Sequence, residues 1–183
     1  NLLLEHLNEG KTARSFNEFE SETFMELNKE LRLLSAKDVI YAANVDEDAI
    51  QNDNEYVKTL KEYAQKNNSE VMKLCSKIEE ELIGLDDLEA KEMLESLGAE
   101  ESGLDAIIRR SFAKLNLISY FTAGVVEVRA WTITNGWKAP KAASVIHNDF
   151  EKGFIRAEVI SYDDFIECGG ENGAKEAGKM RLE

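Results

Sequence analysis

Cysteine and histidine are scarce in this 183-residue chain, which has two of each. Cys75 and Cys168 are too few to build a disulfide scaffold, and such low cysteine usage fits a reducing compartment. The histidines are His6 and His147, and His147 with Asp149 would supply two metal ligands without a third nearby. The sequence therefore predicts neither a disulfide framework nor a metal site, and a turn-stabilising hydrogen bond is the expected role of His147.

Long apolar runs are also missing. No run approaches the roughly 18 residues that would cross a bilayer, and no signal-peptide pattern opens the chain. A hydrophobic fraction of 43% and a charged fraction of 32% are ordinary for a soluble globular protein. We therefore expect a cytoplasmic protein without a membrane partner. The chain begins at Asn1, and its first residues have the pattern of a helix interior, so we expect a fragment.

Basic residues are outnumbered: 22 Lys and Arg face 36 Asp and Glu, which gives a net charge of −14. Such a surface repels phosphate and excludes a whole-surface nucleic-acid binder. Residues 1–116 hold 26 acidic and 14 basic residues, whereas 117–183 hold 10 and 8. At the same place helical periodicity gives way to β-branched and aromatic residues, over 118–133. A domain boundary is therefore expected near residue 116.

A strand, a helix and a second strand are predicted in the first part. Residues 39–43 form a continuous apolar run, which is typical of a strand buried on both faces. A polar helix over 55–66 and a strand over 70–74 follow, so the two strands should be parallel. The loops 44–48 and 75–78 would then leave the carboxyl ends of neighbouring strands, where open α/β sheets bind ligands.

Further helices are indicated by capping residues. Ser15 followed by Glu18 resembles a capping box and predicts a long helix with an apolar face. Asp86 with Glu89, and Ser102, predict the starts of two more helices. We interpret the apolar stripes of the three helices as core: Phe24, Leu27, Leu31 and Leu34 in the first, Leu88, Leu94 and Leu97 in the second, and Leu104, Ile107, Ile108, Phe112 and Leu115 in the third.

We interpret two conspicuous sequence strings as structural features that bind no ligand. Gly10-Lys11-Thr12 resembles the end of a phosphate-binding loop, but that motif needs a glycine where Glu5 stands, and Glu9 adds a second negative charge. A helix end followed by a turn is expected there instead. The acidic run at 79–81 is interpreted as a solvated helix start, where negative charge suits the helix dipole.

The two loops at the sheet edge carry residues of a base-reading site. Residues 44–47 read NVDE, where a GTPase has Asn-Lys-x-Asp after a buried strand, and residues 75–77 read CSK, where it has Ser-Ala-Lys. Each string alone also fits an ordinary turn, because Asn after a strand commonly makes an Asx turn. The residues by themselves leave both interpretations open. The candidate nucleotide-binding residues are Asn44, Val45, Glu47, Cys75, Ser76 and Lys77, with the Cys75 thiol expected to be buried and inert.

Aromatic residues and cations mix in the second part, as they do on RNA-binding faces. Trp131 lies in a strand pattern and is expected in the core, whereas Trp137 follows Gly136 in a predicted turn. The alternative is that the nearby cations only confer solubility. The candidate residues for RNA or ribosome binding are Trp137, Lys138, Lys141, Lys152 and Arg156.

Several longer strings closely resemble the YchF/Obg-like ATPase family. They lie at residues 39–47, 75–79, 120–132, 147–159, 162–165 and 173–178, so the resemblance covers essentially the whole chain. It implies a translation-factor-class NTPase with a G domain, a helical coiled-coil insertion and a TGS domain. Residues 1–34 would end the insertion, 35–116 would be the last part of the G domain, and 117–183 would be most of the TGS domain.

The resemblance implies a fold class of two parts. These are an α/β partial G-domain parallel sheet with helices and a coiled-coil helix, and an α+β β-grasp TGS domain. It also implies that the P-loop, switch regions and Mg²⁺ ligands precede this chain and that the last TGS strands follow it.

Functionally, the resemblance implies that the full-length parent binds ATP or GTP with Mg²⁺, hydrolyses ATP in preference, and meets the ribosome or RNA through its TGS domain. Because the catalytic half is not in this sequence, we expect no catalytic residue here, no tightly bound cofactor and no activity from the chain alone. The alternative is an RNA- or ribosome-binding module without a nucleotide function.

Overall fold

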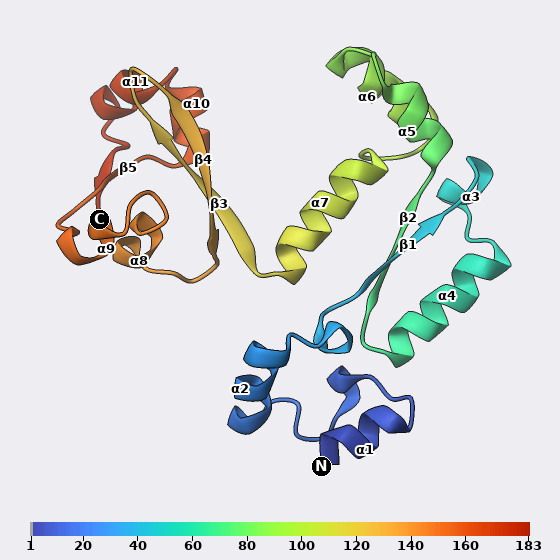
Figure 1. Cartoon of the computed structure of the whole chain (residues 1–183). Coiled ribbons are helices and arrows are strands. Elements are labelled where there is room, and N and C mark those ends of the chain that lie inside the picture. The colour runs from blue at the N-terminus through green and yellow to red at the C-terminus, as the bar shows by residue number, and fades with distance from the viewer. Residues whose placement is uncertain (1) are drawn as a thin grey trace. The chain divides into compact units, whose positions relative to one another are not determined.

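The computed structural model describes residues 2–183, which form two compact units (Figure 1). The first unit ends at Ser111 and the second spans Phe112–Glu183. Helix α7 (Gly103–Lys114) crosses the point of division. The other helices of the first unit are α1 (Leu2–Asn8), α2 (Glu22–Leu31), α3 (Asp48–Gln51), α4 (Glu55–Lys66), α5 (Ser76–Leu82) and α6 (Asp87–Ser96).

A parallel pair of strands forms the centre of the first unit, as the sequence predicts. Strand β1 (Ile40–Asn44) pairs with β2 (Glu70–Leu74) in the register Ile40 to Glu70 and Asn44 to Leu74. Helix α4 connects the two strands and contacts both of them, and its own residues Val57 and Ala64 are buried. Asn54 begins α4 by accepting a hydrogen bond from the Val57 amide at 2.9 Å. Both strand ends, and the loops that follow them, therefore meet at one edge.

Strand β1 is not buried on both faces, so that part of the prediction is wrong. Tyr41 packs edge-on against Tyr63 of α4, with ring centroids 5.8 Å apart. Because side chains alternate along a strand, Ala42 lies on the opposite face, where it is exposed. The apolar run over 39–43 therefore predicts the strand but not its burial, because Ala42 is exposed although its register partner Met72 is only 3% exposed.

The capping box predicted at Ser15 is also wrong. Ser15 ends a short 3-10 helix (Ala13–Ser15), and α2 starts later, where the Ser21 hydroxyl accepts a hydrogen bond from the Phe24 amide at 3.2 Å. The helix ends at Leu31 because Arg32 adopts a left-handed conformation with φ of 51°. The predicted long apolar face is thereby cut short, and Leu34 is 79% exposed in a second 3-10 helix.

A small cluster forms the core around α2. Phe24 packs with Ala13 and Ala36, and partly buried apolar side chains surround them. Phe16 and Phe19 lie against Phe24, with ring centroids 6.1 and 5.0 Å away. Of the stripe predicted for this helix, Phe24 alone is buried, since Leu27 and Leu31 are both exposed.

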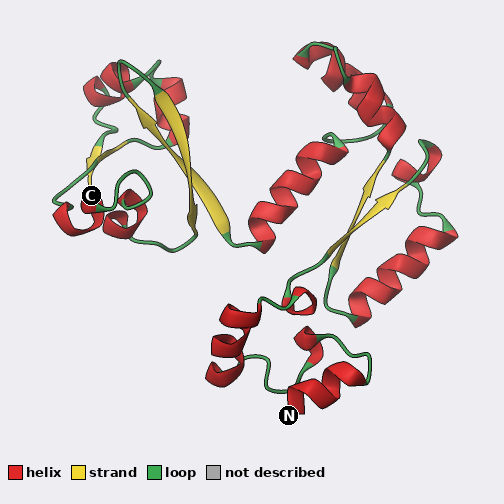
Figure 2. Cartoon of the chain, in the orientation of Figure 1, coloured by secondary structure: helices red, strands yellow, loops and turns green. Residues whose placement is uncertain are grey.

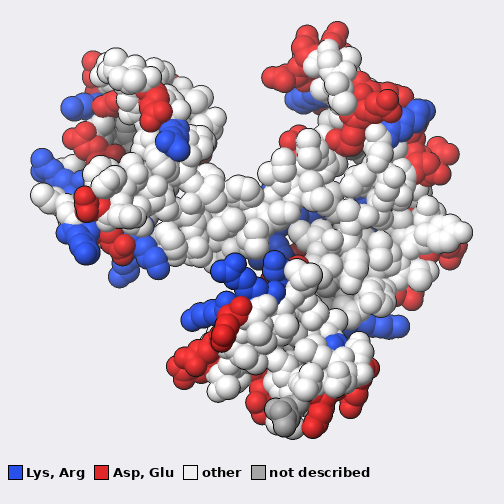
Figure 3. All heavy atoms as spheres, in the orientation of Figure 1, with Lys and Arg blue, Asp and Glu red and all other residues white. Residues whose placement is uncertain are grey.

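The caps predicted for α6 and α7 are confirmed. Asp86 and Glu89 form a reciprocal capping box at the start of α6, and the Ser102 hydroxyl accepts from the Asp105 amide at 3.0 Å before α7. Their apolar stripes are buried only in part: Leu94 and Leu97 of the first stripe, and Ile107 and Phe112 of the second, are half-buried, while Leu104 is 60% exposed. Periodicity thus predicts amphipathic helices, but it does not identify what covers their apolar faces. Figure 3 shows Asp and Glu side chains gathered over α5 and α6.

The second unit combines small antiparallel sheets with short helices (Figure 2). Strands β3 (Leu117–Ala123) and β4 (Val128–Thr134) form a hairpin in which Tyr120 pairs with Trp131, and this confirms the predicted β-rich segment. The Tyr120 hydroxyl donates to the Ala142 carbonyl at 3.0 Å, and burial raises the pKa of that tyrosine. The remaining elements are α8 (Ala139–Ala143), α9 (Asp149–Gly153), β5 (Glu158–Val159), α10 (Tyr162–Glu167), α11 (Glu171–Glu176) and β6 (Arg181–Leu182).

Close packing of α11 depends on a glycine. A Cβ at Gly173 would lie 1.9 Å from the carbonyl oxygen of Cys168, so any larger residue there forces the backbone apart. The pair of strands β5 and β6 closes this region in an antiparallel register, Glu158 to Leu182.

Within residues 2–183, none of the helices combines the length and the apolar character that a membrane span requires.

Candidate nucleotide-binding site

An open cavity of about 610 Å³ lies at the carboxyl ends of β1 and β2. Its lining comes from both loops that the sequence nominates, so the parallel crossover brings together segments about 30 positions apart. Two carboxylates that the sequence interpretation did not include, Asp46 and Asp48, also line it. The full lining is Asn44, Val45, Asp46, Glu47, Asp48, Cys75, Ser76 and Lys77.

Asn44 joins the two loops. Its side-chain Oδ1 accepts hydrogen bonds from the Ser76 amide at 3.1 Å and from the Ser76 hydroxyl at 3.0 Å. One residue further, the Val45 amide donates to the Leu74 carbonyl at 2.8 Å and extends the parallel ladder past the end of β1. The side-chain Oδ1 of Asn44 is thus occupied in bracing the loops. Together with the bond from Val45 to Leu74, its two bonds to Ser76 fix the cavity wall between the loops.

Glu47 and Lys77 meet across the cavity. The Lys77 ammonium lies 2.6 Å from the Glu47 carboxylate and 3.8 Å from that of Glu81. The hydrogen bond from Lys77 to Glu47 and the charge of that carboxylate raise the pKa of Lys77. Because the lysine side chain is 67% exposed, solvent screens this pair, and it contributes little to stability. The pair matters for the site because Lys77 donates to Oε1 of Glu47 and so occupies that oxygen.

Cys75 follows the last residue of β2 and is the N-cap residue of α5, with its side chain turned away from solvent. The residue is 3% exposed, as the sequence predicts, so it meets the cavity through its backbone, not its thiol. The candidate nucleotide-binding residues therefore fall into two groups, those that bring polar side chains and those that bring backbone groups. Asn44, Glu47, Ser76 and Lys77 bring polar side chains, which are paired with one another as Asn44 with Ser76 and Glu47 with Lys77, while Val45 and Cys75 bring mainly backbone groups.

The interpretation of the acidic run as a solvated helix start is wrong for Glu79. Its carboxylate accepts hydrogen bonds from the Gly103 amide at 2.6 Å and from the Leu104 amide at 3.3 Å, which caps the first turn of α7. A Cβ at Gly103 would lie 2.7 Å from the Leu74 Cβ, so glycine permits this close approach. No local signal could reveal the role, because the capped amides lie 24 and 25 positions away.

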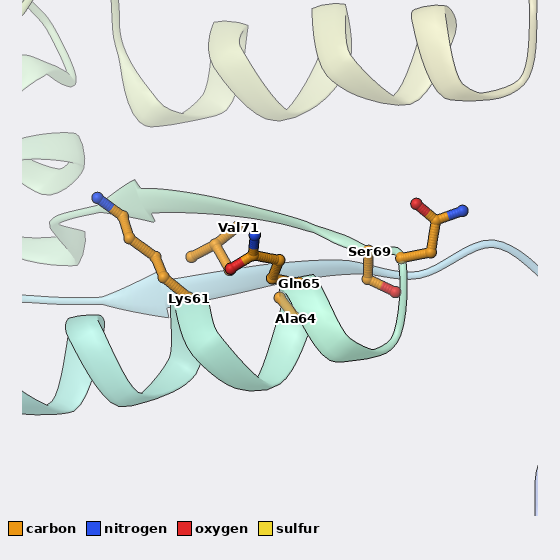
Figure 4. A pocket seen from close by; sticks show the side chains of 6 residues that line it. Lys61, Ala64, Gln65, Ser69 and Val71 are labelled. Atoms are coloured by element: carbon orange, nitrogen blue, oxygen red, sulfur yellow. The ribbon is translucent and has the colours of Figure 1, made fainter.

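A second, smaller hollow of about 290 Å³ lies beside α4 and β2, away from these loops (Figure 4). Lys61 of its lining forms an ion pair with Asp53. The lining consists of Lys61, Ala64, Gln65, Asn68, Ser69 and Val71.

The Gly10-Lys11-Thr12 string forms a turn after α1, as predicted. Gly10 has φ of 77°, and the Lys11 ammonium lies 2.5 Å from the Glu9 carboxylate. A phosphate would have to displace that carboxylate. Among residues 2–183 there is no group of three His, Cys, Asp or Glu side chains that could hold a metal ion.

The candidate RNA-binding residues lie on and around α8 and α9 of the second unit. Lys141 places its ammonium 4.5 Å from the ring centre of Trp137, which is half-buried. Lys138 precedes α8, Lys152 lies on α9, and Arg156 follows it, all three exposed. The two helices pack together, and Figure 3 shows Lys and Arg side chains over this part.

Two neighbouring expectations have different outcomes. Trp131 is half-buried rather than fully in the core, with Arg129 at 4.2 Å from its ring centre and its indole Nε1 donating to the Thr122 hydroxyl at 2.9 Å. His147 stabilises a turn, as predicted, because its Nδ1 accepts from the Asp149 amide at 3.3 Å.

Comparison with known proteins identifies the family. Residues 117–183 match the family described as YchF-GTPase_C, "Protein of unknown function (DUF933)". The chain is 57% identical over 155 residues to the "Ribosome-binding ATPase YchF" of Haemophilus influenzae, covering 85% of this chain and 42% of that protein. It is 51% identical over 175 residues to the protein of that name in Bacillus subtilis, covering 94% and 47%.

The likeness extends to a eukaryotic relative and to a solved structure. The "Obg-like ATPase 1" of Rattus norvegicus is 42% identical over 180 residues, covering 96% of this chain and 44% of that protein. The structure of the Schizosaccharomyces pombe YchF GTPase superposes with a TM-score of 0.77 at 36% identity, covering 98% of this chain and 48% of that one.

The mixed α/β fold agrees with a partial G domain followed by a TGS-like domain. The chain belongs to the YchF/Obg-like ATPase family and corresponds to its C-terminal portion. It spans about half the length of the curated relatives it matches.

Proposed function

We propose that this chain is the base-recognition and TGS portion of a cytoplasmic, ribosome-associated NTPase. The observation that carries the proposal is the Asn44 brace between two loops at the carboxyl ends of parallel strands, beside a cavity. The names of the bacterial relatives, which join ribosome binding with ATPase activity, support it. In this proposal residues 1–34 belong to a helical insertion, 35–116 to a G domain, and 117–183 to a TGS domain.

ATP is the preferred nucleotide in this proposal. Guanine presents two ring-edge donors to a carboxylate held at a fixed depth, as an Asp provides. Glu47 is one methylene longer, and Lys77 already occupies its carboxylate at 2.6 Å. The Val45 amide already donates to the Leu74 carbonyl, so the Val45 carbonyl is the backbone group that would accept from the adenine amino group. ATP or GTP with Mg²⁺ would bind the full-length protein, and Mg²⁺ would be held by residues outside those described here.

The base preference can be tested by a double substitution in the full-length protein. Val45→Lys with Glu47→Asp restores the guanine-reading pattern and removes the partner that Lys77 holds, so the ratio of ATP to GTP affinity should fall by about tenfold, the effect of one good hydrogen bond. Calorimetric titration with each nucleotide measures it.

Glu80→Asp is the matched control, since it shortens a nearby exposed glutamate of α5 outside the cavity lining. An unchanged ratio in the double variant would contradict the role given to the 44–47 loop. Absence of nucleotide binding by the unmodified protein would contradict the proposed function itself.

A second candidate function is an RNA- or ribosome-binding module whose nucleotide loops are idle. The observation in its favour is the Trp137 ring with the Lys141 ammonium over it, next to three more cations. An aromatic ring flanked by cations can stack a base and hold its phosphate. The two functions are compatible in one protein, and they differ in whether nucleotide binding alters ribosome binding.

A further inference from the structure

The short helix after the base-facing loop depends on contacts from outside itself. Helix α3 has four residues, and its N-cap residue Glu47 makes no capping hydrogen bond. The Asp46 carboxylate accepts from the Ala49 amide at 3.3 Å, a long contact. Because isolated helices shorter than about 12 residues are marginal in water, α3 cannot fix the loop by its own hydrogen bonds.

The first external contact comes from the neighbouring strand. The Lys73 ammonium donates to the Ala49 carbonyl at 2.9 Å and lies 2.9 Å from the Asp53 carboxylate. Asp53 also forms an ion pair with Lys61 of α4, and hydrogen bonds from these two lysines lower the pKa of Asp53. The Lys73 side chain is 19% exposed, so its bond to the carbonyl is sheltered from solvent.

The second contact comes from the turn after α6. The Gln51 side-chain Nε2 donates to the Leu97 carbonyl at 3.0 Å. The next residue, Gly98, has φ of 67°, and a Cβ there would lie 2.3 Å from that Nε2. The turn is therefore shaped to admit the glutamine, and α3 is held from the sheet on one side and from α6 on the other.

We propose that Lys73 and Gln51 are positioning residues that set base preference through Glu47, an inference that rests on the proposed function. Ala49 lies two residues after Glu47, so the bond from Lys73 fixes the backbone that carries the Glu47 carboxylate. That carboxylate must stay in place to meet Lys77. Among the residues that line the cavity there is neither Lys73 nor Gln51, so both act at a distance from the nucleotide.

Kinetics of the full-length protein test the proposal. Lys73→Met keeps the side-chain length and removes the donor, and it should raise KM for ATP about tenfold, narrow the ATP to GTP preference, and leave kcat within about twofold. Lys73→Arg, which keeps the charge and donors, should restore most of the loss. The control is Lys58→Met, which removes an exposed lysine of α4 paired with Glu55.

Gln51→Leu is a second variant should Lys73→Met fail to fold, and it should shift KM in the same direction. Gln65→Leu, on α4, is its control. Hydrogen exchange of the unliganded protein supplies an independent readout, in which amides of 45–51 should exchange faster in both test variants than in their controls.

The outcomes separate two failures. If the unmodified protein binds nucleotide but Lys73→Met and Gln51→Leu keep its ATP to GTP preference and its exchange rates, the positioning role is overturned. If the unmodified protein binds no nucleotide, the proposed function fails and the inference fails with it. A lower melting temperature with an unaltered KM ratio would show a merely structural role and would also overturn the inference.

Discussion

Two residues fix the loop at 75–77 from behind. Glu79 caps the amides of Gly103 and Leu104, and the absence of a side chain at Gly103 lets the start of α7 lie against Leu74, the last residue of β2. A carboxylate at a helix N-terminus also complements the helix dipole. The loop that presents Ser76 to Asn44 is therefore supported by tertiary contacts on both sides.

At Gly173 the steric requirement predicts a stability change. Gly173→Ala places a Cβ 1.9 Å from the Cys168 carbonyl oxygen, and the forced backbone shift should lower the free energy of unfolding by about 1–3 kcal/mol. Urea denaturation measures it. Gly153→Ala is the control, because nothing lies within 4 Å of a Cβ built there. Equal stability of the two variants would show that α11 can shift freely away from Cys168.

Residue-scale roles are where the sequence falls short. The pairing of Asn44 with the 75–77 loop could be predicted, because the parallel crossover places both strand ends together. The role of Glu79 could not. It depends on how α5 and α7 fold back on each other in three dimensions, and neither charge nor spacing along the chain encodes that.

At the scale of helices and strands, the sequence predicts where an element begins and ends more reliably than it predicts which of its residues are buried. The helix at 55–66 and the strand at 70–74 have the predicted bounds, since Asn54 caps the helix and the strand begins a few residues after the helix ends at Lys66. The start of α2 differs because Ser21, not Ser15, supplies the cap. The apolar stripes of α2, α6 and α7 are less buried than their periodicity predicts, with Phe24 alone fully buried among the stripe residues.

At the start of α10 a carboxylate links two elements and predicts a pH effect. Hydrogen bonds from the Ser161 hydroxyl and from Lys179 lower the pKa of Asp164, and they join α10 to the segment after α11. A lowered carboxyl pKa stabilises the fold above the ordinary Asp value, and that contribution is lost as the pH falls through the lower, folded value.

Asp164→Asn should therefore reduce the melting temperature at neutral pH, and the difference from the unmodified protein should shrink toward zero below about pH 3. Thermal unfolding followed by circular dichroism across that range measures it. Asp163→Asn, in the same turn, is the control. A difference that stays constant with pH would mean that the Asp164 charge contributes nothing.

The whole molecule divides its charge unevenly, with most of the negative excess before residue 117. The region after it is nearly neutral, so an RNA backbone can approach there at lower electrostatic cost. Replacing Lys138, Lys141 and Lys152 together with Glu in the full-length protein should weaken cosedimentation with ribosomes and flatten its salt dependence, while ATP hydrolysis is retained. The control replaces Lys58, Lys66 and Lys91 with Glu, which makes the same change of charge before residue 117. Unaltered sedimentation of the test variant would move the ribosome contact to another surface.

The chain tested alone should bind ATP weakly and hydrolyse none. Phosphate contacts and Mg²⁺ supply most of the affinity of P-loop proteins, and the described residues offer neither a phosphate cradle nor a metal cluster. A few base contacts of about 1 kcal/mol each leave a Kd on the order of millimolar. Phosphate release by the purified 183-residue chain measures turnover, and activity above a buffer blank would contradict this prediction.

The buried thiol just after β2 makes opening of the cavity edge observable by chemical labelling of a native residue. Cys75 is 3% exposed, whereas Cys168 is only partly buried. A maleimide dye reaches Cys75 only when the junction of β2 and α5 opens, so its labelling rate reports the opening free energy of that junction. Cys168 serves as the fast internal reference within the same molecule, and a bound nucleotide that closes the edge would appear as slower labelling of Cys75 alone.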